Sequence, residues 1–566
     1  MKRKFRMFMF GVLTLSLVLA ACGPAATTAP PGPDVPVAAT EADEVPTEEV
    51  VDEPVVMRIG NIEGPDCFNP WACGQFWFYT DSVWEGFTGF DIDCDIKNRV
   101  AKEMELSEDG LTWTITIQEG VTFSDGEPLN AYTVEELWDW YNATELKEWY
   151  PITLYATSWE ALDEYTFQIT TEVPVGSLPG WGGMWSFLLP PHIWGDKDDE
   201  TLYTFDNPVI GSGPYTLEEY VPGEYLIFDA RSDYWGGVPA ADRLVFQIFS
   251  NWDAQIQALM NGEIDVTDRA VPAQYYEPLD ADPNITLIER DVGYRYYLNF
   301  NLAEAGIKHP AVEDIAVRRA FDYAIDKQQL IDVVLLGHGH LCANTWACTP
   351  YGDMVPDPTL EVRPYDPQEA IRILEEAGYL DSDGDGVRES PDGQPLKFRF
   401  LYNAVRPNEV TISGLIADWL SEIGIALVLE GMEEGTLLTT TRDLRDFDIA
   451  MIYYVDEIDP AGGADFWFSC WSAEGGTAVT NDSGYCSQEM DDAIFESITT
   501  IDPVERLEVA HKIGRIVDRD LPIINLMAEN YIQAYRNDNF VWDEVGCTSM
   551  GGLWDAPGLM QVKAVE

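Results

Sequence analysis

A bend followed by two short strands occupies the segment Asn207–Trp235, near the middle of the chain. The segment opens with Asn-Pro and then Gly-Ser-Gly-Pro at residues 211–214. Glycine there can supply positive φ, while proline fixes φ and disfavours helix in the residue before it. Two strands are expected next, one from Tyr215 and one over residues 226–229, with Val-Pro-Gly-Glu at 221–224 as the turn between them. The segment therefore predicts a sharp return of the chain into a β-sheet.

The length of 566 residues exceeds what one hydrophobic core supports, so two or three domains are expected. The sequence shows no internal repeat. Trp113, Ile115 and Ile117 alternate with polar residues, which predicts a strand with one apolar face. Residues 317–325 carry apolar side chains at i, i+3, i+4, i+7 and i+8, which predicts a helix that faces a core.

Several helix ends can be read from their capping residues. Asp-Pro-Gln-Glu at 366–369 and Asp-Pro-Val-Glu at 502–505 each place a cap, a proline at N1 and a glutamate at N3 in register. Thr133 begins Thr-Val-Glu-Glu, which has capping-box spacing and is expected to start a helix. Gly262 and Gly378 stand where helices are expected to stop.

Residues 1–21 have the features of a secretory signal: a basic start, a short apolar run and small residues before Cys22. The apolar run is too short to span a bilayer. A cysteine at this position resembles the lipobox of bacterial lipoproteins, and the resemblance implies that Cys22 becomes the acylated N-terminus. An ordinary signal peptide with a chance cysteine is the alternative. Residues 22–53 lack aromatic side chains and are rich in Pro, Ala, Thr and acids, which predicts a lipidated disordered tether.

The net charge of −66 argues against nucleic acid and anionic lipid as partners, because both would be repelled. We therefore expect contact with the membrane through the lipid anchor only. The acidity is typical of an extracellular solubility surface, and attraction for cationic solutes is the other interpretation.

The cysteines other than Cys22 are even in number, which in an exported chain favours disulfides. Short spacings favour three pairs, and the fourth is what remains; the connectivity stays open. The absence of Cys-x-x-Cys and the scatter of the histidines argue against a zinc site. The favoured pairs are Cys67 with Cys73, Cys342 with Cys348, Cys470 with Cys486 and, as the remainder, Cys94 with Cys547.

A loop at residues 381–392 has oxygen ligands spaced as in a calcium-binding loop, with Gly386 at position 6. Position 12 is an aspartate, which is shorter than the usual glutamate, and no flanking helix pair is evident. The loop is therefore either a structural calcium site or a metal-free acidic turn. The ligands of the calcium hypothesis are Asp381, Asp383, Asp385, the carbonyl of Val387, Glu389 and Asp392. No other cofactor is expected.

Catalytic motifs are absent from the sequence. It contains no Gly-x-Ser-x-Gly, no His-Glu-x-x-His and no phosphate-binding loop. A secreted hydrolase would need a selected pair of carboxylates, and no motif selects two among the 99 acidic residues. We therefore predict that the protein is not an enzyme.

Several motifs resemble those of the peptide-type (family 5) extracellular solute-binding proteins of ABC transporters, and they occur in the same order. Gly-Ser-Gly-Pro-Tyr at 211–215 and Gly-Glu-Ile-Asp at 262–265 match. Residues 109–126 and 317–326 are similar almost position for position. The family ends its hairpin with Asn-x-x-Tyr-Trp, whereas this chain has Arg231 in place of the asparagine.

The resemblance implies an α/β, two-lobed fold of the periplasmic-binding-protein type (type II, with an extra small domain), with mixed sheets and flanking helices. Lobe I would comprise residues 54–90, 206–294 and 536–566. Residues 91–205 would form the small domain, and residues 295–535 would form lobe II.

The resemblance also implies ligand-binding residues. In peptide-binding relatives, the aspartate that follows a strand of lobe II pairs with the ammonium of the peptide, a role that falls on Asp456 here. Tyr453 stands in place of the family's tryptophan, and a turn-capping role for Asp456 is the alternative. Arg406 could receive a peptide carboxylate, and tryptophans in loops could stack on sugars, although aromatic side chains are more often core. The candidate ligand-binding set is Asn69, Trp71, Gly74, Gln75, Arg406, Tyr454, Asp456, Asp459 and Trp467.

These inferences predict an extracytoplasmic lipoprotein, anchored to the cell membrane, that captures oligopeptides by lobe closure and delivers them to an ABC permease. An oligosaccharide ligand is the alternative within the same family, and a secreted hydrolase is the alternative outside it. We expect a monomer.

Overall fold

The chain separates into two units, Met1–Glu53 and Pro54–Glu566, and every residue described by the computed structural model belongs to the second unit. The signal, Cys22 and the tether therefore lie outside the described residues. The described residues are 54–62, 64–65, 68, 79, 82–91, 95–144, 155–183, 187–195, 209–267, 270–346, 348, 356–455, 460–473, 481–542 and 562–565.

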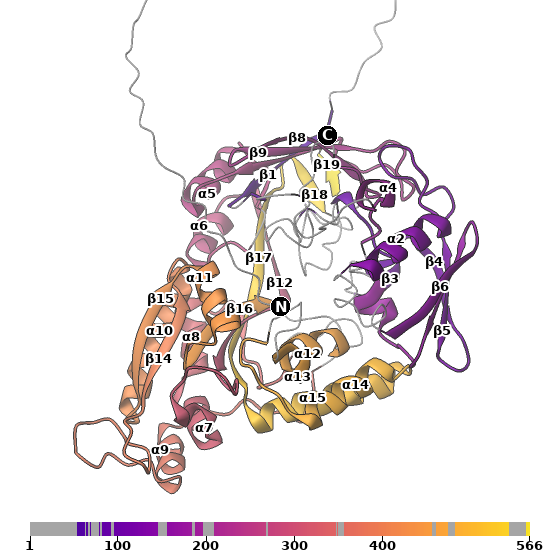
Figure 1. Cartoon of the computed structure of the whole chain (residues 1–566). Helices are drawn as coiled ribbons and strands as arrows, with labels where there is room; N and C mark the ends of the chain where they lie inside the picture. The colour runs from indigo at the N-terminus through magenta and orange to yellow at the C-terminus, as the bar shows by residue number, and fades with distance from the viewer. Residues whose placement is uncertain are drawn as a thin grey trace, which may run out of the picture. The chain divides into compact units, whose positions relative to one another are not determined.

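One large mixed sheet forms the frame of this unit (Figure 1). It has 11 strands in the order β15-β14-β16-β12-β17-β11-β1-β10-β9-β8, and β13 pairs with β17 off this path. The strands are β1 (Val56–Asn61), β8 (Tyr215–Val221), β9 (Tyr225–Ala230), β10 (Arg243–Ile248), β11 (Val266–Thr267), β12 (Ile285–Phe300), β13 (Gly339–His340), β14 (Lys397–Asn403), β15 (Ala426–Met432), β16 (Ile449–Val455) and β17 (Ile523–Arg536).

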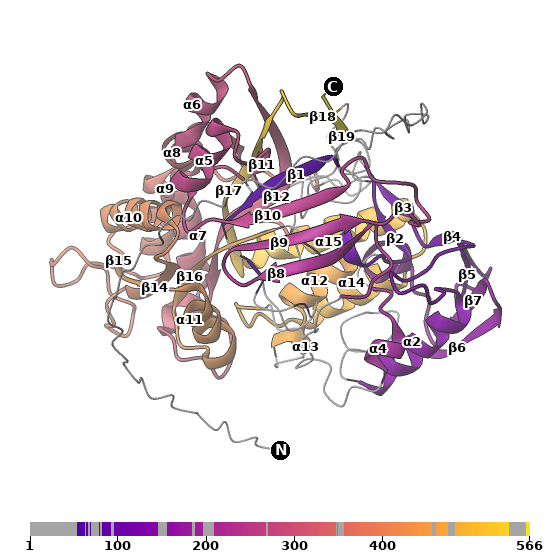
Figure 2. The same cartoon turned by 90° about the horizontal axis from the view of Figure 1, so that it is seen from above.

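Two long antiparallel strands, β12 and β17, connect the halves of this sheet. Their register runs from Ile285 opposite Arg536 to Asn299 opposite Ile523. At one end β17 pairs with β11, which leads to the group β1, β10, β9 and β8 that Figure 2 shows side by side. At the other end β12 pairs with β16, and the parallel strands β14 and β15 follow. Both halves of the sheet therefore share the same two strands.

The predicted hairpin is confirmed as β8 and β9, and Gly223 in the turn has φ of 74°. The glycines of the preceding bend differ from the prediction, because Gly211 and Gly213 do not have positive φ. They are needed for close approach: a Cβ on Gly211 would lie 2.0 Å from the carbonyl oxygen of Val83. The bend is thus held against the chain at residues 82–83 and not by a left-handed backbone.

Arg231, at the end of the hairpin, is 5% exposed. Its guanidinium donates to the carbonyl oxygens of Thr122 at 3.1 Å, Phe123 at 3.3 Å, Gly213 at 3.3 Å and Gly211 at 3.4 Å. The residue that departs from the family motif therefore joins the hairpin to the segment at 122–123.

A second, antiparallel sheet has the order β4-β5-β7-β6 and carries helix α2. Trp113, Ile115 and Ile117 on β5 are buried, as the alternation predicts. The helix begins earlier than predicted: Asn130 is its N-cap, and Thr133 is the N3 residue of that capping box. Asn130 takes the N-cap position because its side chain accepts hydrogen bonds from the amides of both Tyr132 and Thr133. The elements are β4 (Ala101–Leu106), β5 (Thr112–Ile117), α2 (Ala131–Ala143), β6 (Ala156–Asp163) and β7 (Thr166–Thr171).

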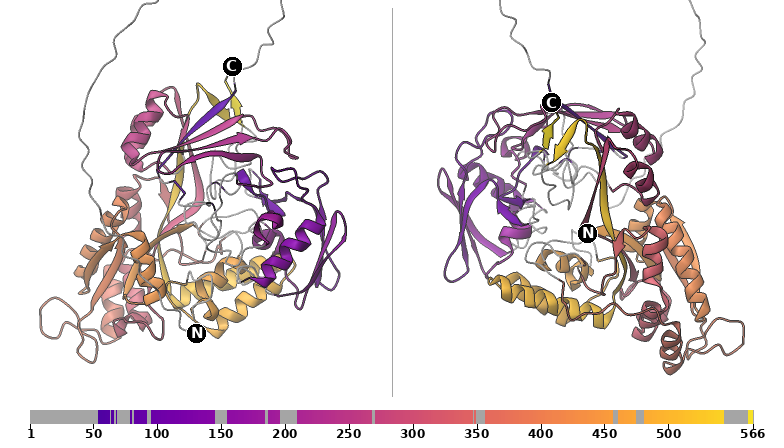
Figure 3. Two further views of the ribbon diagram at one scale, coloured as in Figure 1. Left: turned by 45° about the horizontal axis from the view of Figure 1, so that its top comes forward. Right: turned by 180° about the vertical axis from the view of Figure 1, so that it is seen from behind.

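Helices cover both faces of the β14–β16 half of the large sheet (Figure 3). Leu298 and Met451 belong to the core under α7, α8, α9 and α10, whereas Tyr297 and Ile452 belong to the core under α12, α14 and α15. Adjacent residues serve opposite cores because side chains alternate along a strand. The helices are α7 (Ile315–Ala324), α8 (Lys327–Val334), α9 (Pro367–Glu376), α10 (Pro407–Glu422), α12 (Pro460–Phe468), α14 (Gln488–Thr499) and α15 (Pro503–Asp520).

The capping predictions for two of these helices are confirmed. Asp366 caps α9 and Asp502 caps α15, each with proline in the first turn. Gly262 ends α5 (Trp252–Asn261) in the left-handed region, and Gly378 follows α9 with φ of 89°. The remaining elements are β2 (Thr88–Phe90), β3 (Ile96–Asn98), η2 (Leu178–Gly182), α4 (Pro191–Trp194), η4 (Ala273–Tyr275), α6 (Tyr276–Asp280), η5 (Pro310–Glu313), α11 (Glu434–Leu438), η6 (Thr439–Leu444), α13 (Cys470–Ala473), β18 (Phe540–Trp542) and β19 (Val562–Ala564).

The loop after β7 touches the connection between α14 and α15. The amide of Gly176 donates to the carbonyl oxygen of Ile498 at 2.9 Å, and Arg506 donates to the carbonyl oxygen of Gly176 at 3.4 Å. The rings of Tyr155 and Phe495 meet edge to face at 6.2 Å beside this contact. We call this contact the Gly176 contact.

Two of the favoured disulfides are present: Cys342 is joined to Cys348 and Cys470 to Cys486. Cys67, Cys73, Cys94 and Cys547 lie outside the described residues. A search of the described helices finds none whose length and apolarity would suffice for a membrane span. The proposed boundaries of lobes and small domain stay predictions.

Candidate functional site

Three of the predicted ligand-binding residues fall in the described part of the chain: Arg406, Tyr454 and Trp467. Tyr454 and Trp467 lie together, and Arg406 lies in a different cluster. The other predicted residues, Asn69, Trp71, Gly74, Gln75, Asp456 and Asp459, lie outside the described residues.

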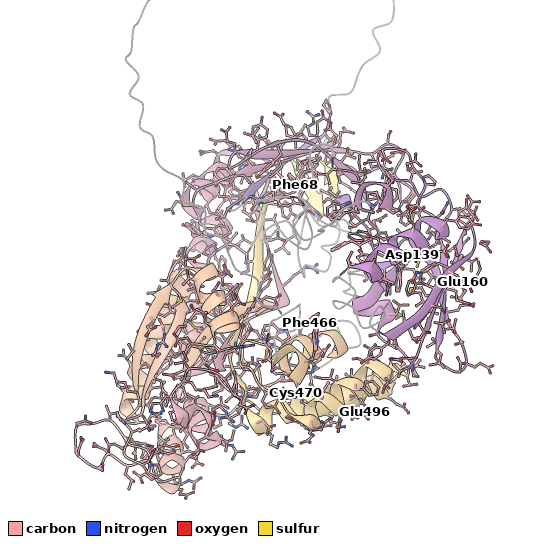
Figure 4. The ribbon with its side chains drawn as sticks, in the orientation of Figure 1. Phe68, Asp139, Glu160, Phe466, Cys470 and Glu496 are labelled. Carbon is pink, nitrogen blue, oxygen red and sulfur yellow. A yellow bond between two sulfur atoms is a disulfide. The ribbon has the colours of Figure 1, made fainter. Side chains whose placement is uncertain are left out.

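Tyr454 is the last residue but one of β16, and Trp467 is near the end of α12. Their ring centroids are 5.0 Å apart with an angle of 71° between the planes. Tyr297 on β12 meets the same indole at 5.5 Å and also at 71°. Figure 4 labels Phe466, the neighbour of Trp467 on α12, and Cys470, which begins α13. Trp467, which was expected in a loop, lies on α12 instead, packs against two tyrosines from adjacent strands and is 6% exposed.

Arg406 follows the carboxyl end of β14 and is already paired. Its Nη2 donates to both carboxylate oxygens of Glu434, at 2.9 and 3.0 Å, and its Nη1 donates to Glu409 at 3.2 Å. The guanidinium also lies 5.2 Å from the ring centre of Tyr453. A ligand carboxylate would have to share this cation with two glutamates, so the assigned role of Arg406 stays a prediction.

A buried carboxyl group that the sequence did not single out lies on β17. Glu529 is 7% exposed, and burial raises its pKa to about 7 against the opposing effects of hydrogen bonds with Tyr453 and Tyr296 and the charge of Arg406. Burial likewise raises the pKa of Glu409 to about 7. The only sequence feature that pointed to this cluster is the repetition of tyrosines in β12 and β16. Their partner, Glu529, is more than 200 positions away from Tyr296 in the sequence.

The acidic loop brings four carboxylates together. Oxygen atoms of Asp381, Asp383, Asp385 and Glu389 lie within 4.8 Å of one another. Asp381 accepts from the amides of Gly384 and Gly386, at 2.7 and 3.1 Å, which orients it. Among the described residues, this is the group of acids, histidines and cysteines with spacing suited to a metal. Asp392, the sixth predicted ligand position, is outside that group and accepts from Ser390 instead.

Comparisons with known proteins give a consistent result. The family model described as "Bacterial extracellular solute-binding proteins, family 5 Middle" matches residues 95–475. The nickel-binding periplasmic protein of Escherichia coli (strain K12) is 28% identical over 378 residues, which cover 65% of this chain and 69% of that protein.

Two solved structures show the same fold. NikZ from Campylobacter jejuni, in complex with Ni(L-His), has a TM-score of 0.77 at 21% identity over 90% of this chain and 99% of its own. The oligopeptide-binding protein AppA from Bacillus subtilis, in complex with a nonapeptide, has a TM-score of 0.75 at 21% identity over 91% of this chain and 100% of its own. The mixed α/β, two-lobed fold predicted from the sequence is therefore confirmed.

Proposed function

The chain belongs to the bacterial extracellular solute-binding proteins of family 5, and from this premise we propose that it captures oligopeptides for an ABC importer. As a member of this family, it is an extracytoplasmic protein that binds a small solute and works with an ABC permease. The match of the family model over residues 95–475 carries the proposal. The family match supports the binding of a small solute, and the oligopeptide is the more specific part of the proposal.

Peptide is our first choice because of the residues expected at the carboxyl end of β16. Asp456 follows this strand directly, and the resemblance gives it the peptide ammonium as partner. A carboxylate paired with an ammonium away from water forms a charge-assisted hydrogen bond. The fold shared with the nonapeptide complex of AppA agrees with a ligand of this size. The other assigned contacts, Asn69, Trp71, Gly74, Gln75 and Asp459, are proposed with it.

We propose that capture works by closure of the two lobes. β12 and β17 belong to both halves of the large sheet, so a change of twist or bend in these strands would move one half against the other. A ligand that contacts both lobes only in the closed arrangement shifts the equilibrium by its differential affinity. The ligand is then released unchanged, without catalysis.

An oligosaccharide is the second candidate, because sugar rings stack on aromatic side chains; Trp467 itself is 6% exposed and packs against Tyr297 and Tyr454. The related nickel-binding protein adds a third solute to be tested. Among the described residues, however, the metal-compatible group is the acidic loop, which contains no histidine.

We also propose that Cys22 is acylated and that residues 22–53 tether the monomeric protein to the outer face of the membrane. Replacement of Cys22 by serine should release the protein into the medium and abolish labelling with radioactive palmitate. Labelling of the serine variant would contradict this proposal.

The acidic loop is proposed as a structural calcium site. Carboxylate oxygens on a tight loop are ligands that Ca²⁺ prefers, and four of them are already gathered. Asp381, Asp383, Asp385 and Glu389 would supply side-chain oxygens, and Val387 would supply its carbonyl. No role in solute binding is assigned to the ion.

Thermal-shift titration of the mature protein tests the proposed function. The panel contains peptides of two to nine residues, maltooligosaccharides and Ni²⁺ with histidine. We expect stabilisation by peptides, because a ligand that binds only the folded state raises the melting temperature by mass action. Stabilisation by sugars or by Ni²⁺ with histidine, and not by any peptide, would replace the peptide assignment.

A further inference from the structure

The two strands that join the halves of the large sheet are irregular in one short stretch. The ladder of β12 and β17 shifts register within residues 291–294 of β12 and again at residues 296–297. On one side of this stretch, Ile285 and Ile532 belong to the core that contains α5 and α6, whereas Leu298 on the other side belongs to the core under α7–α10. A bulge interrupts the ladder and bends a strand. We therefore expect the two strands to bend between these cores.

A short segment of the chain, residues 338–346 with Cys348, lies along β17 at this bend. We call it the hinge strap. Its first part pairs with β17 as β13, and the approach is close: a Cβ on Gly339 would lie 2.6 Å from the carbonyl oxygen of Ala528. Its last part is closed into a loop by the disulfide between Cys342 and Cys348. The strap is thus a compact body that rests on a strand of the hinge.

The disulfide end of the strap is fixed to both strands beyond the first register shift. Arg295 on β12 donates to the carbonyl oxygens of Thr345 at 2.9 Å and Trp346 at 2.6 Å. Asn525 on β17 donates to the carbonyl oxygens of Ala343 at 2.7 Å and Thr345 at 3.0 Å. Arg295 is 2% exposed and Asn525 is fully buried. This end of the strap therefore moves with the part of the sheet that covers the α7–α10 core.

His338, at the other end of the strap, reaches across the register shift at 291–294. Its Nδ1 lies 3.0 Å from Oε1 of Glu289 on β12, and Nδ2 of Asn530 donates to the same oxygen at 2.6 Å. The ring of Tyr276 on α6 meets the imidazole edge to face at 4.5 Å. Tyr276 belongs to the core on the α5–α6 side of the bend. We call the contact of His338 with Glu289 and Tyr276 the His338 clasp.

A strained turn places His338 in this contact. Leu336 and Gly337, which follow α8, have φ of 52° and 91°. The left-handed region is unfavourable for a residue with a Cβ, and the side chain of Leu336 is 57% exposed, so its burial does not offset the strain. Hydrogen bonds hold the turn: the amide of Gly337 donates to Ile331 at 3.1 Å, and the amide of Asn530 donates to the carbonyl oxygen of His338 at 3.2 Å. Strain of this kind persists where the surrounding contacts fix the backbone.

The clasp joins groups whose charge depends on pH. Burial alone would raise the pKa of Glu289, but hydrogen bonds from Asn530 and His338 and the charge of His338 lower it, so this carboxylate is ionised near neutral pH. Burial and the charges of Glu529 and Glu289 raise the pKa of Tyr276, which therefore keeps its proton. Histidine is the side chain that ordinarily gains its proton between pH 8 and pH 5. Acidification thus adds a positive charge beside an ionised carboxylate.

We propose that the His338 clasp is a pH-sensitive brace across the hinge, which favours the closed arrangement of the lobes and tightens solute binding on acidification. The strap is fixed on one side of the bend and its clasp partners lie on the other, so bending of β12 and β17 separates them. The clasp is formed in the same structure as the Gly176 contact. This inference rests on the proposed closure of the lobes and adds its regulation by pH.

Small-angle X-ray scattering of the mature protein without added solute tests the clasp. We expect a smaller radius of gyration at pH 5.5 than at pH 7.5, because a charged clasp favours closure. His338→Ala should remove this difference and give the larger radius at both pH values. His338→Asn places an amide donor near the position of Nδ1 without the charge. It should therefore restore the wild-type radius at pH 7.5 and show no response to pH.

Calorimetric titration with an alanine pentapeptide measures the consequence for binding. An exposed ion pair changes an equilibrium constant by a factor of up to about 5. The wild type should therefore bind up to about fivefold more tightly at pH 5.5 than at pH 7.5, and His338→Ala should lose this change. His192→Gln is the matched control, because His192 pairs with Asp125 at 2.7 Å outside the hinge strands and its side chain is 36% exposed, as is that of His338. This control should keep the full response to pH.

Three outcomes would overturn the inference. The first is a wild type whose radius does not depend on pH. The second is His338→Ala with the radius and the pH response of the wild type, since the clasp would then be kept in both arrangements. The third is a response that survives in His338→Ala and vanishes in Glu529→Gln, because the buried carboxyl group, whose pKa burial raises to about 7, would then carry it.

The two measurements also separate the clasp from the proposed ligand. A pH-dependent radius in the wild type and in His192→Gln, absent from His338→Ala, supports the clasp whether or not the pentapeptide binds. If the scattering gives this result and no peptide binds, the clasp stands and the peptide assignment alone is wrong.

Discussion

Adding one methyl group to Gly176 should disrupt the Gly176 contact between the loop after β7 and the α14–α15 connection. In Gly176→Ala the new Cβ would lie 2.2 Å from the carbonyl oxygen of Thr500 and 3.1 Å from the Cα of Ile501. Both neighbours are backbone atoms, so no side-chain rotation can relieve the clash. One of the two loops has to move.

The loss of stability in Gly176→Ala has two contributions, a steric clash and a weakened hydrogen bond. Overpacking of a tight contact costs about 1–3 kcal/mol. Displacement of the loop also lengthens the hydrogen bond from Gly176 to Ile498, which is worth about 0.5–1.5 kcal/mol. We therefore expect Gly176→Ala to lower the free energy of unfolding by about 2–4 kcal/mol.

Guanidinium denaturation of the mature protein, followed by tryptophan fluorescence, measures this difference. Gly414→Ala is the matched control, because a Cβ there meets no heavy atom within 4 Å and the residue lies inside α10. Alanine is the better helix former by up to about 1 kcal/mol, so the control should be as stable as the wild type or more stable. If Gly176→Ala unfolds at the wild-type midpoint, the two loops are not in contact as described.

Three further predictions concern other parts of the molecule. The folded state holds the proton of Glu529 more tightly than the unfolded chain does, since burial raises its pKa to about 7. Its contribution to stability therefore falls as the pH rises from about 4.5 to 7. Over this interval the free energy of unfolding of Glu529→Gln should rise by up to about 3 kcal/mol relative to that of the wild type. If urea denaturation gives the same difference between variant and wild type at pH 5 and at pH 8, this prediction is wrong. Replacement of Cys470 and Cys486 by alanine should lower the free energy of unfolding by about 3 kcal/mol, because the unfolded chain regains the freedom of the closed loop, and an unchanged denaturation midpoint would refute it. Calorimetry should detect Ca²⁺ binding with Kd of about 10⁻⁴–10⁻³ M. Asp383→Asn should abolish this binding, whereas Asp392→Asn should leave it intact, since Asp392 is outside the group of four carboxylates. Equal binding by both variants would exclude the loop as the calcium site.

The sequence predicted those parts of the fold that depend on near neighbours. The caps at Asp366 and Asp502, the buried stripe of α7 and the alternation of β5 follow from contacts within a turn or a strand. The start of α2 shows the limit of this reasoning, because two overlapping capping signals compete and only the geometry decides for Asn130.

Groups assembled from distant strands could not be found in the same way. Glu529 meets Tyr296 and Tyr453 only because β12 lies between β16 and β17 in a particular register. The segment that contains Asp482 lies beside the end of β12 because the amide of Leu302 donates to the carbonyl oxygen of Ser483. Trp467 was chosen as a tryptophan expected in a loop and Tyr454 as a residue near the end of a strand, and their contact with each other became visible only in the structure.

The hydrogen bonds of Arg231 limit how this architecture can be shortened. A chain engineered without residues 91–205 would lose the oxygen atoms of Thr122 and Phe123, which accept three hydrogen bonds from Arg231 at the root of the β8–β9 hairpin. The small sheet is therefore no detachable module in this protein. In a two-domain derivative Arg231 would keep Gly211, Gly213 and Asp233 as partners and would meet water where residues 122 and 123 had been.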